Sequence, residues 1–145
     1  MTTTQDSTTA KPVFYSTTGL STGMGRDGTA EIEGGDLELE MAIAGGNRKG
    51  ANPEQLFAMG YAACFHSALK LQGSRRKLST KDSTVAARVQ LVGTLEEGLT
   101  LAVRLSVRLP ALDREEALTL VQAAHEVCPY SHATRDNIPV ELEVV

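Results

Sequence analysis

Two cysteines are the residues of this sequence best suited to carry out chemistry. Cys64 lies inside a long apolar segment, residues 52–65, and Cys128 lies within residues 125–131. Neither has another cysteine near it, so the chain cannot form a cysteine-rich metal cage. The start of the chain has no secretory signal, which argues against the structural disulfide of an exported protein. The interpretation that remains is a redox-active pair of thiols.

Cys64 needs help to react. A cysteine attacks as its thiolate, and an ordinary thiol, with a pKa of about 8.5, is only slightly ionised at neutral pH. The apolar neighbours of Cys64 raise the pKa of such a thiol, and the residue lies too far along its predicted helix for the helix dipole to reach it. A cation from elsewhere is therefore required. The best candidate is Arg26 in the glycine-rich segment 25–28, where it could act as a mobile gate, with Glu54 as the carboxylate that orients it.

The spacing of Glu54 and Cys64 poses a geometric problem. Both lie on one face of the predicted helix, with Phe57 and Tyr61 between them, but ten residues of α-helix rise about 15 Å. An unbroken helix therefore keeps Glu54 out of a compact site at Cys64 of the same chain. In a homodimer, two such helices crossing antiparallel would bring Glu54 of one chain near Cys64 of the other. This composite site is a hypothesis that depends on the roles assumed for Arg26 and Glu54.

These residues also have purely structural explanations. A cysteine in an apolar helix is most often inert packing, a glutamate at the second helical position usually complements the helix dipole, and an arginine in a glycine-rich turn is usually solvated. A zinc site is a weaker alternative. His125 and Cys128 have the spacing of two ligands, but only His66 and His132 remain as nearby nitrogen donors, and no closed set of four forms. Composition and spacing alone leave the redox and the structural explanations open.

The order of the predicted elements indicates an α+β fold. A helix is expected to begin at Pro53, with Asn52 as its N-cap, and to stop at Gly73. A second helix starts at the Asp113 capping box and ends near residue 127, ahead of Pro129. Strands are expected at residues 13–18, 29–33, 37–43, 84–95, 99–109 and 139–145. Because the hairpins demand antiparallel pairing, we expect antiparallel sheets packed around a long, buried central helix.

Length and composition restrict the function. A chain of 145 residues is long enough for one domain, residues 12–145, after a threonine-rich tail, residues 1–11, that is expected to be disordered. The net charge of −4 argues against nucleic acid as a partner. The longest apolar run, residues 56–65, is about half of what is needed to cross a bilayer. With no signal peptide, the protein is expected to be cytoplasmic, without nucleic acid or membrane as a partner.

Three segments, residues 25–28, 52–65 and 124–131, resemble the organic hydroperoxide resistance branch of the OsmC-like family, and the resemblance extends over residues 13–145. It implies the OsmC-like fold, an intertwined homodimer with composite active sites, and a thiol-dependent peroxidase that reduces organic hydroperoxides to alcohols. It also implies Cys64 as the peroxidatic thiolate, Cys128 as the resolving cysteine that forms a disulfide with it, and Arg26 and Glu54 as the activating pair.

We expect no bound cofactor and no metal, and the same resemblance implies that dihydrolipoamide or a lipoylated protein recycles the disulfide. The helix has an apolar surface formed by Phe57, Met59, Tyr61 and Phe65. We expect Phe57, Tyr61 and Phe65 to bind the substrate. Such a surface favours alkyl or fatty acyl hydroperoxides over hydrogen peroxide, which gains nothing from hydrophobic burial. The alternative function is a thiol redox sensor or a small-ligand binding protein on the same fold, with little turnover.

Overall fold

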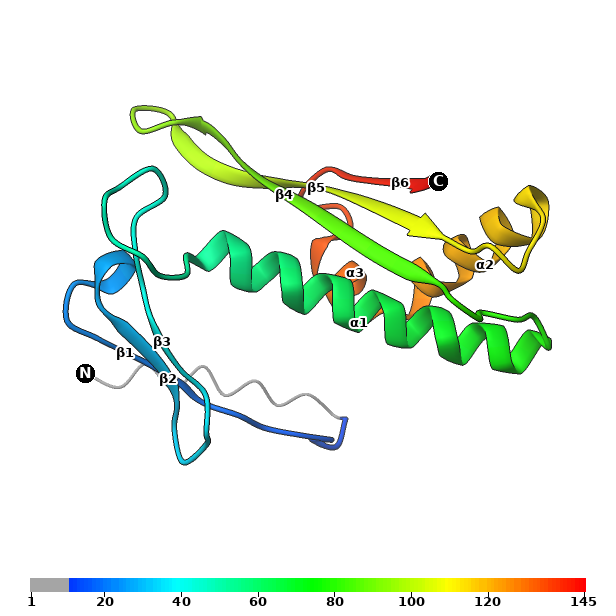
Figure 1. The fold of residues 1–145 in the computed structure, drawn as a ribbon, viewed down its shortest axis with the longest axis horizontal. Helices are drawn as coiled ribbons and strands as arrows, with labels where there is room; N and C mark the ends of the chain where they lie inside the picture. The colour runs from blue at the N-terminus through cyan, green and yellow to red at the C-terminus, as the bar shows by residue number, and fades with distance from the viewer. Residues whose placement is uncertain (1–10) are drawn as a thin grey trace. The chain divides into compact units, whose positions relative to one another are not determined.

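The computed structural model describes residues 11–145 (Figure 1). They form two compact units, where the sequence predicted one domain over residues 12–145. The first unit ends at Ala51, and the second is Asn52–Val145. The predicted tail, residues 1–11, lies outside the described residues except for Lys11. Within residues 11–145, none of the helices combines the length and the apolar character that a membrane span requires.

The first unit contains a three-stranded antiparallel sheet in the order β1-β2-β3. Its elements are β1 (Gly19–Thr22), the 3-10 turn η1 (Gly25–Asp27), β2 (Thr29–Ile32) and β3 (Glu38–Glu40). The predicted strands at residues 29–33 and 37–43 are confirmed, although both are shorter. The strand predicted at residues 13–18 is wrong: the strand here is Gly19–Thr22, and the pairing with β2 extends before Gly19 only as far as Thr18, whose carbonyl oxygen accepts from the N–H of Glu33 at 2.9 Å.

The second unit begins with α1 (Pro53–Arg76), which starts where the sequence predicts. The Asn52 side chain accepts a hydrogen bond from the backbone N–H of Gln55 at 2.9 Å, and the Gln55 side chain accepts one from the N–H of Asn52 at 3.0 Å. Pro53 occupies the first helical position, where its missing N–H costs nothing. These local interactions are those of a capping box, which is why the helix start could be predicted.

The predicted end of α1 at Gly73 is wrong. The helix continues to Arg76 and ends at Lys77, which has a left-handed φ of 57°. Gly73 instead allows residues 78–80 to pack closely against α1. A Cβ atom at this position would lie only 2.6 Å from Cγ2 of Thr80 and 3.1 Å from the carbonyl oxygen of Leu78. The chain that leaves α1 therefore folds back directly against the backbone of the last helical turns.

The second sheet has the order β4-β5-β6 and is not antiparallel throughout. Its strands are β4 (Thr84–Thr94), β5 (Gly98–Arg108) and β6 (Val140–Val144), and the chain between β5 and β6 forms α2 (Arg114–Val127) and α3 (Pro129–Thr134). β4 and β5 form the predicted antiparallel hairpin, whereas β6 pairs with β5 in parallel. The prediction of purely antiparallel sheets is wrong here because the two helices return the chain to the middle of β5, where Val140 lies opposite Val103, so that β6 runs on in the same direction as β5 (Figure 1).

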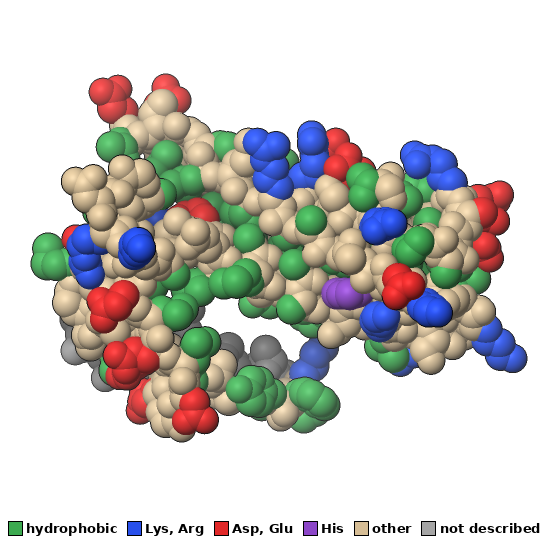
Figure 2. Space-filling model, viewed as in Figure 1, with side chains coloured by type: hydrophobic (Ala, Val, Ile, Leu, Met, Phe, Trp, Pro, Cys, Tyr) green, Lys and Arg blue, Asp and Glu red, His purple; other side chains and the backbone are tan. Residues whose placement is uncertain are grey.

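Polar pairs on the outward face of this sheet match the register of β6. Arg104 lies opposite Glu141 and donates to its carboxylate at 3.0 and 3.2 Å. Ser106 lies opposite Glu143 and donates to it at 2.5 Å. A slip by one residue would break both pairs and turn the apolar side chains of β6 outward. Figure 2 shows both basic and acidic side chains on the visible face.

The core of the second unit lies between α1, α2 and the inner face of the sheet. Tyr61, Phe65 and Leu69 follow one another at four-residue intervals on α1, and all three are fully buried. The complete cluster of buried residues comprises Tyr61, Phe65, Ala68, Leu69, Val103, Leu105, Val107, Leu109, Ala117, Leu120, Val121, Ala124 and Cys128. The other side of α1 exposes Met59 and Leu71, so in the single chain the helix is buried on one side only. Burial on all sides remains a prediction for a homodimer.

The close packing at Gly73 can be tested by adding one methyl group. Gly73→Ala should lower the free energy of unfolding by about 1–2 kcal/mol, because the cost of overpacking exceeds the gain of about 1 kcal/mol in helix propensity. Urea denaturation measures the change. Ser74→Ala, at the neighbouring exposed position, is the matched control and should not destabilise. Thr80→Ser, which removes the obstructing Cγ2 atom, should partly restore stability to Gly73→Ala. A Gly73→Ala protein as stable as the parent would contradict this packing.

Candidate active site

The structure brings the two cysteines of the predicted redox pair together. Cys64 lies in the middle of α1, Cys128 follows the last residue of α2, and their sulfur atoms form a hydrogen bond at 3.6 Å. Both are free thiols. A disulfide has an S–S distance of about 2.05 Å, so closing the bond requires the sulfurs to approach by roughly 1.5 Å. Cys128 is fully buried, whereas Cys64 is partly exposed, so the two thiols differ in their access to solvent.

Pro129 determines where Cys128 lies. A proline disfavours helical backbone in the residue before it, and Cys128 has the extended dihedrals φ −64° and ψ 123°. The same residue is therefore the C-cap of α2 and the N-cap of α3, with Pro129 in the first position of the new helix. The sequence predicted the end of α2 from Pro129, but it did not predict α3. This sharp turn leaves the Cys128 side chain facing α1.

The environment of Cys64 acts on its ionisation in both directions. Burial raises the pKa of the Cys64 thiol, a backbone hydrogen bond from Tyr130 lowers this pKa, and the neighbouring Cys128 raises it again. The net direction is upward, so the thiol is less ionised at neutral pH than an ordinary cysteine. This agrees with the sequence-based argument that Cys64 needs activation. The Tyr130 amide is a source of activation that sequence reasoning missed, although Pro129 marks the start of a helical turn with N–H groups to spare.

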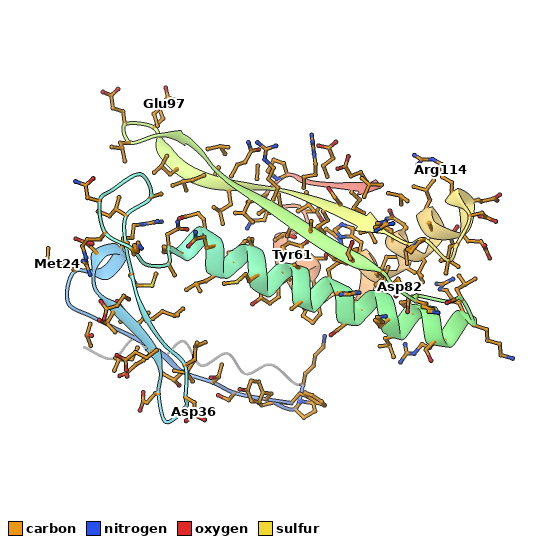
Figure 3. The ribbon with its side chains drawn as sticks, in the orientation of Figure 1. Met24, Asp36, Tyr61, Asp82, Glu97 and Arg114 are labelled. Carbon is orange, nitrogen blue, oxygen red and sulfur yellow. The ribbon has the colours of Figure 1, made fainter. Side chains whose placement is uncertain are left out.

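A hydrogen-bonded network next to the thiols links α1, α2 and α3. The Ser131 hydroxyl lies 2.8 Å from the Tyr61 hydroxyl and 2.8 Å from Nδ1 of His125, and Tyr61 also lies 3.1 Å from the Thr134 hydroxyl. Figure 3 shows Tyr61 on the side of α1 that meets α3. Ser131 and Tyr61 are fully buried. Because a buried polar group is costly unless it is paired, these contacts favour a single docking position of α3 on α1.

His125 is held in this network from two sides. Its Nδ1 contacts Ser131, and its carbonyl oxygen accepts a hydrogen bond from Arg135 at 2.7 Å. Burial lowers the pKa of His125, and the positive charge of Arg135 lowers it further, against an opposing effect of Glu126. The neutral imidazole is therefore favoured at neutral pH. This assignment makes His125 part of the support for α3.

The three predicted substrate-binding residues differ in their location. Tyr61 and Phe65 are fully buried in the core, so neither side chain offers a surface to a ligand in this structure, and their contact with substrate stays a prediction. The apolar stripe was visible in the sequence, but the side of it that faces the core was not. Phe57 is only partly buried. Its ring meets Tyr61 edge-on at 5.9 Å and Tyr130 at 6.0 Å.

Arg26 lies in η1 of the first unit, in a turn that is tied down by another arginine. Arg48 donates to the carboxylate of Asp27 at 2.6 Å and to its carbonyl oxygen at 2.9 Å. The backbone conformation explains why glycines flank Arg26. Gly25 has a φ of 65°, and a Cβ atom at Gly28 would collide with the carbonyl oxygen of Thr22. The glycines therefore do not require the mobile gate that the sequence suggested.

Glu54 is the second residue of α1, and the helix runs without interruption from there through Gly60 to Cys64. The ten residue steps from Glu54 to Cys64 correspond to a rise of about 15 Å. Within one chain, α1 therefore holds this carboxylate away from the two sulfur atoms. The composite site predicted from the sequence keeps its geometric motivation, because the break in the helix that would remove the need for it is absent.

No cluster of three or more His, Cys, Asp or Glu side chains that could hold a metal ion occurs within the part of the chain that the structure describes. His125, one of the two residues with zinc-ligand spacing, already contacts Ser131 through Nδ1. His66 lies 2.9 Å from the Ser83 hydroxyl through Nε2. Both imidazoles therefore have hydrogen-bond partners within the protein.

Known proteins are similar to this chain in sequence and in fold. The family model described as OsmC-like protein matches residues 45–143. The organic hydroperoxide resistance protein of Xanthomonas axonopodis pv. citri is 39% identical over 134 residues, covering 90% of this chain and 94% of the relative. OhrA of Bacillus subtilis, also named an organic hydroperoxide resistance protein, is 40% identical over 140 residues, covering 93% and 98%.

Solved structures agree with these relatives. The crystal structure of the organic hydroperoxide resistance protein OhrB of Bacillus subtilis superimposes with a TM-score of 0.84 at 38% identity, covering 92% of this chain and 100% of that one. An organic hydroperoxide resistance protein from Legionella pneumophila superimposes with a TM-score of 0.86 at 43% identity, covering 92% and 98%. The chain therefore belongs to the OsmC-like family, in its branch of organic hydroperoxide resistance proteins.

Proposed function

We propose that this protein is a thiol-dependent peroxidase that reduces alkyl or fatty acyl hydroperoxides to alcohols, and that it serves resistance to organic hydroperoxides. The observation that carries the proposal is the pair of free thiols 3.6 Å apart, one partly exposed and one buried. The names of the relatives support the role in resistance. The partly exposed Phe57 ring beside the site provides apolar surface for an organic substrate.

The chemistry begins at Cys64 because it is the more accessible thiol. Its thiolate attacks the O–O bond of the hydroperoxide, so that an S–O bond forms, the O–O bond breaks, and the leaving alkoxide takes up a proton to become the alcohol. The product on Cys64 is a sulfenic acid. The sulfur of Cys128, already adjacent, attacks the sulfur of Cys64, forming the disulfide and releasing the sulfenic oxygen as water. Two thiols are oxidised and one hydroperoxide is reduced.

The disulfide must be reduced before another cycle. A dihydrolipoyl group, free as dihydrolipoamide or attached to a protein, supplies two thiols that reduce it by thiol–disulfide exchange and become the lipoyl disulfide. No bound cofactor takes part in this scheme. The partly exposed Cys64 is the sulfur that an external thiol attacks first, because Cys128 is fully buried.

The raised pKa of Cys64 calls for a cation, and Arg26, oriented by Glu54, is the proposed source. Since α1 is unbroken, we assign the assembly of this pair with Cys64 to a homodimer in which Glu54 serves the cysteine of the other subunit. The exposed side of α1 supports a second copy as the partner. Met59, Ala63 and Leu71 are exposed there and lie at multiples of four residues along the helix, as the contact face of a helix requires.

The roles of the two thiols predict different outcomes for their serine variants. Cys64→Ser should abolish reaction with an organic hydroperoxide. Cys128→Ser should still permit one oxidation of Cys64, but the sulfenic acid then persists and oxidises further, because no resolving thiol remains. Mass spectrometry after one equivalent of cumene hydroperoxide measures the products, with the intramolecular disulfide of the unmodified protein as control. A first sulfenic acid on Cys128 would reverse the assignment.

The composite site predicts that two inactive variants restore each other. When a Cys64→Ser homodimer and a Glu54→Ala homodimer exchange subunits, both mutations of a heterodimer fall in one site and the second site is intact, so activity should reappear. The control is exchange of Cys64→Ser with the double variant Cys64→Ser/Glu54→Ala, which leaves no intact site. Confirmed exchange without returning activity would place Glu54 with its own chain, or outside the site.

A further inference from the structure

Gly60 lies one helical turn before Cys64, on the same side of α1. A Cβ atom at this position would lie 2.8 Å from the hydroxyl oxygen of Tyr130 and 3.2 and 3.3 Å from two carbons of its ring. A glycine in a helix interior costs about 1 kcal/mol relative to alanine. The backbone of α1 gives no other reason for it, since Gly60 is not among the glycines with positive φ. The glycine therefore allows the Tyr130 ring to lie directly against the helix.

The rings of Phe57 and Tyr61 both lie next to the Tyr130 ring. The ring centroid of Tyr130 is 6.0 Å from that of Phe57 and 5.7 Å from that of Tyr61, at tilted angles. Phe57 and Tyr61 are four residues apart on α1, one on each side of Gly60 in the sequence. Together the three residues form a notch on α1, with Gly60 as its floor and the two rings as its walls. Tyr130 lies in this notch with 38% of its surface exposed.

The backbone of the same tyrosine reaches Cys64. The N–H of Cys128 is already bonded to the carbonyl oxygen of Ala124, and Pro129 has no N–H. Tyr130 therefore carries the first available N–H of α3, and this group hydrogen-bonds to the Cys64 sulfur. Tyr130 thus contacts α1 at two points, with its ring at Gly60 and its N–H at Cys64. These two points are one helical turn apart, about 6 Å along the helix axis. The position of the ring therefore adds to the contacts of α3 with α1 that fix where the amide points.

We propose that Tyr130 is a positioning residue for Cys64: its ring, held in the notch over Gly60, keeps its backbone N–H on the Cys64 sulfur and stabilises the thiolate. This role rests on the proposed function only in so far as Cys64 is taken to be the reacting thiol. The quantity at stake is the ionisation of Cys64, which can be measured without a peroxide. Ring packing that served stability alone would leave this ionisation unchanged.

The test is the pH profile of alkylation of Cys64 by iodoacetamide in the full chain, with Cys128→Ser as background so that only Cys64 reacts. Adding Gly60→Ala should push the ring out of the notch and weaken the hydrogen bond to the thiolate. The midpoint of the profile should then rise by about half to one pH unit, a roughly 3- to 10-fold slower reaction at neutral pH. Tyr130→Leu, which lacks the ring, should shift the midpoint in the same direction.

Tyr130→Phe is the matched control, because it keeps the ring and should keep the midpoint. Removing the hydroxyl oxygen also removes the closest obstacle to a Cβ atom at position 60, so Gly60→Ala/Tyr130→Phe should recover part of the shift. Circular dichroism and urea denaturation establish that each variant is folded. If Gly60→Ala does not fold, Tyr130→Leu decides the question. Folded variants in which neither Gly60→Ala nor Tyr130→Leu moves the midpoint would overturn the proposal.

The outcome separates this inference from the proposed function. The peroxidase would be refuted if the unmodified protein failed to reduce organic hydroperoxides. If the alkylation midpoint of Cys64 still shifted as expected in the variants, the role of Tyr130 would stand. Hydroperoxide reduction with an unchanged midpoint in the Gly60→Ala and Tyr130→Leu variants would refute the role of Tyr130 alone.

Discussion

The contact between the first turn of α3 and the middle of α1 determines where the Cys128 sulfur lies relative to the Cys64 sulfur. Pro129 forces the chain to turn at Cys128, and the buried hydroxyl of Ser131 bonds to Tyr61 on α1, so the turn has one favoured position. Apolar packing alone tolerates small displacements, whereas a buried hydrogen bond loses its partner when it slips. The approach of the thiols to 3.6 Å follows from this docking. So does the backbone hydrogen bond from Tyr130 to Cys64.

Local signals in the sequence predicted most helices and strands, and contacts between distant segments explain the errors. The starts of α1 and α2 were predictable because Asn52 and Asp113 bond to residues three positions later. Alternation along β6 predicted a strand but said nothing of its partner, and its parallel pairing follows from the return of the chain through α2 and α3. A glycine after a helical segment is typical of a helix end, so the sequence predicted that α1 stops at Gly73. Its role in packing against Thr80 is visible only once the chain has folded back.

The candidate site was predictable where residue type alone carries the chemistry. Cys64 and Cys128 were found from their type and isolation, and the structure places them in contact across 64 positions of sequence. The buried network around Ser131 and the amide of Tyr130 were not found, because their roles depend on how α3 lies against α1. Phe65 was assigned to substrate because helical periodicity reveals an apolar stripe without saying which neighbour covers it. The roles of Arg26 and Glu54 remain predictions for an assembled homodimer.

Turnover is the property that separates a peroxidase from a thiol redox sensor or a ligand-binding protein on the same fold. Its most direct measurement is the steady-state consumption of an organic hydroperoxide with dihydrolipoamide as the reductant. If the adjacent thiols act as proposed, each chain consumes many equivalents at a constant rate, and the disulfide does not accumulate while reductant remains. Consumption that stops after one equivalent per chain, despite excess dihydrolipoamide, would contradict the peroxidase.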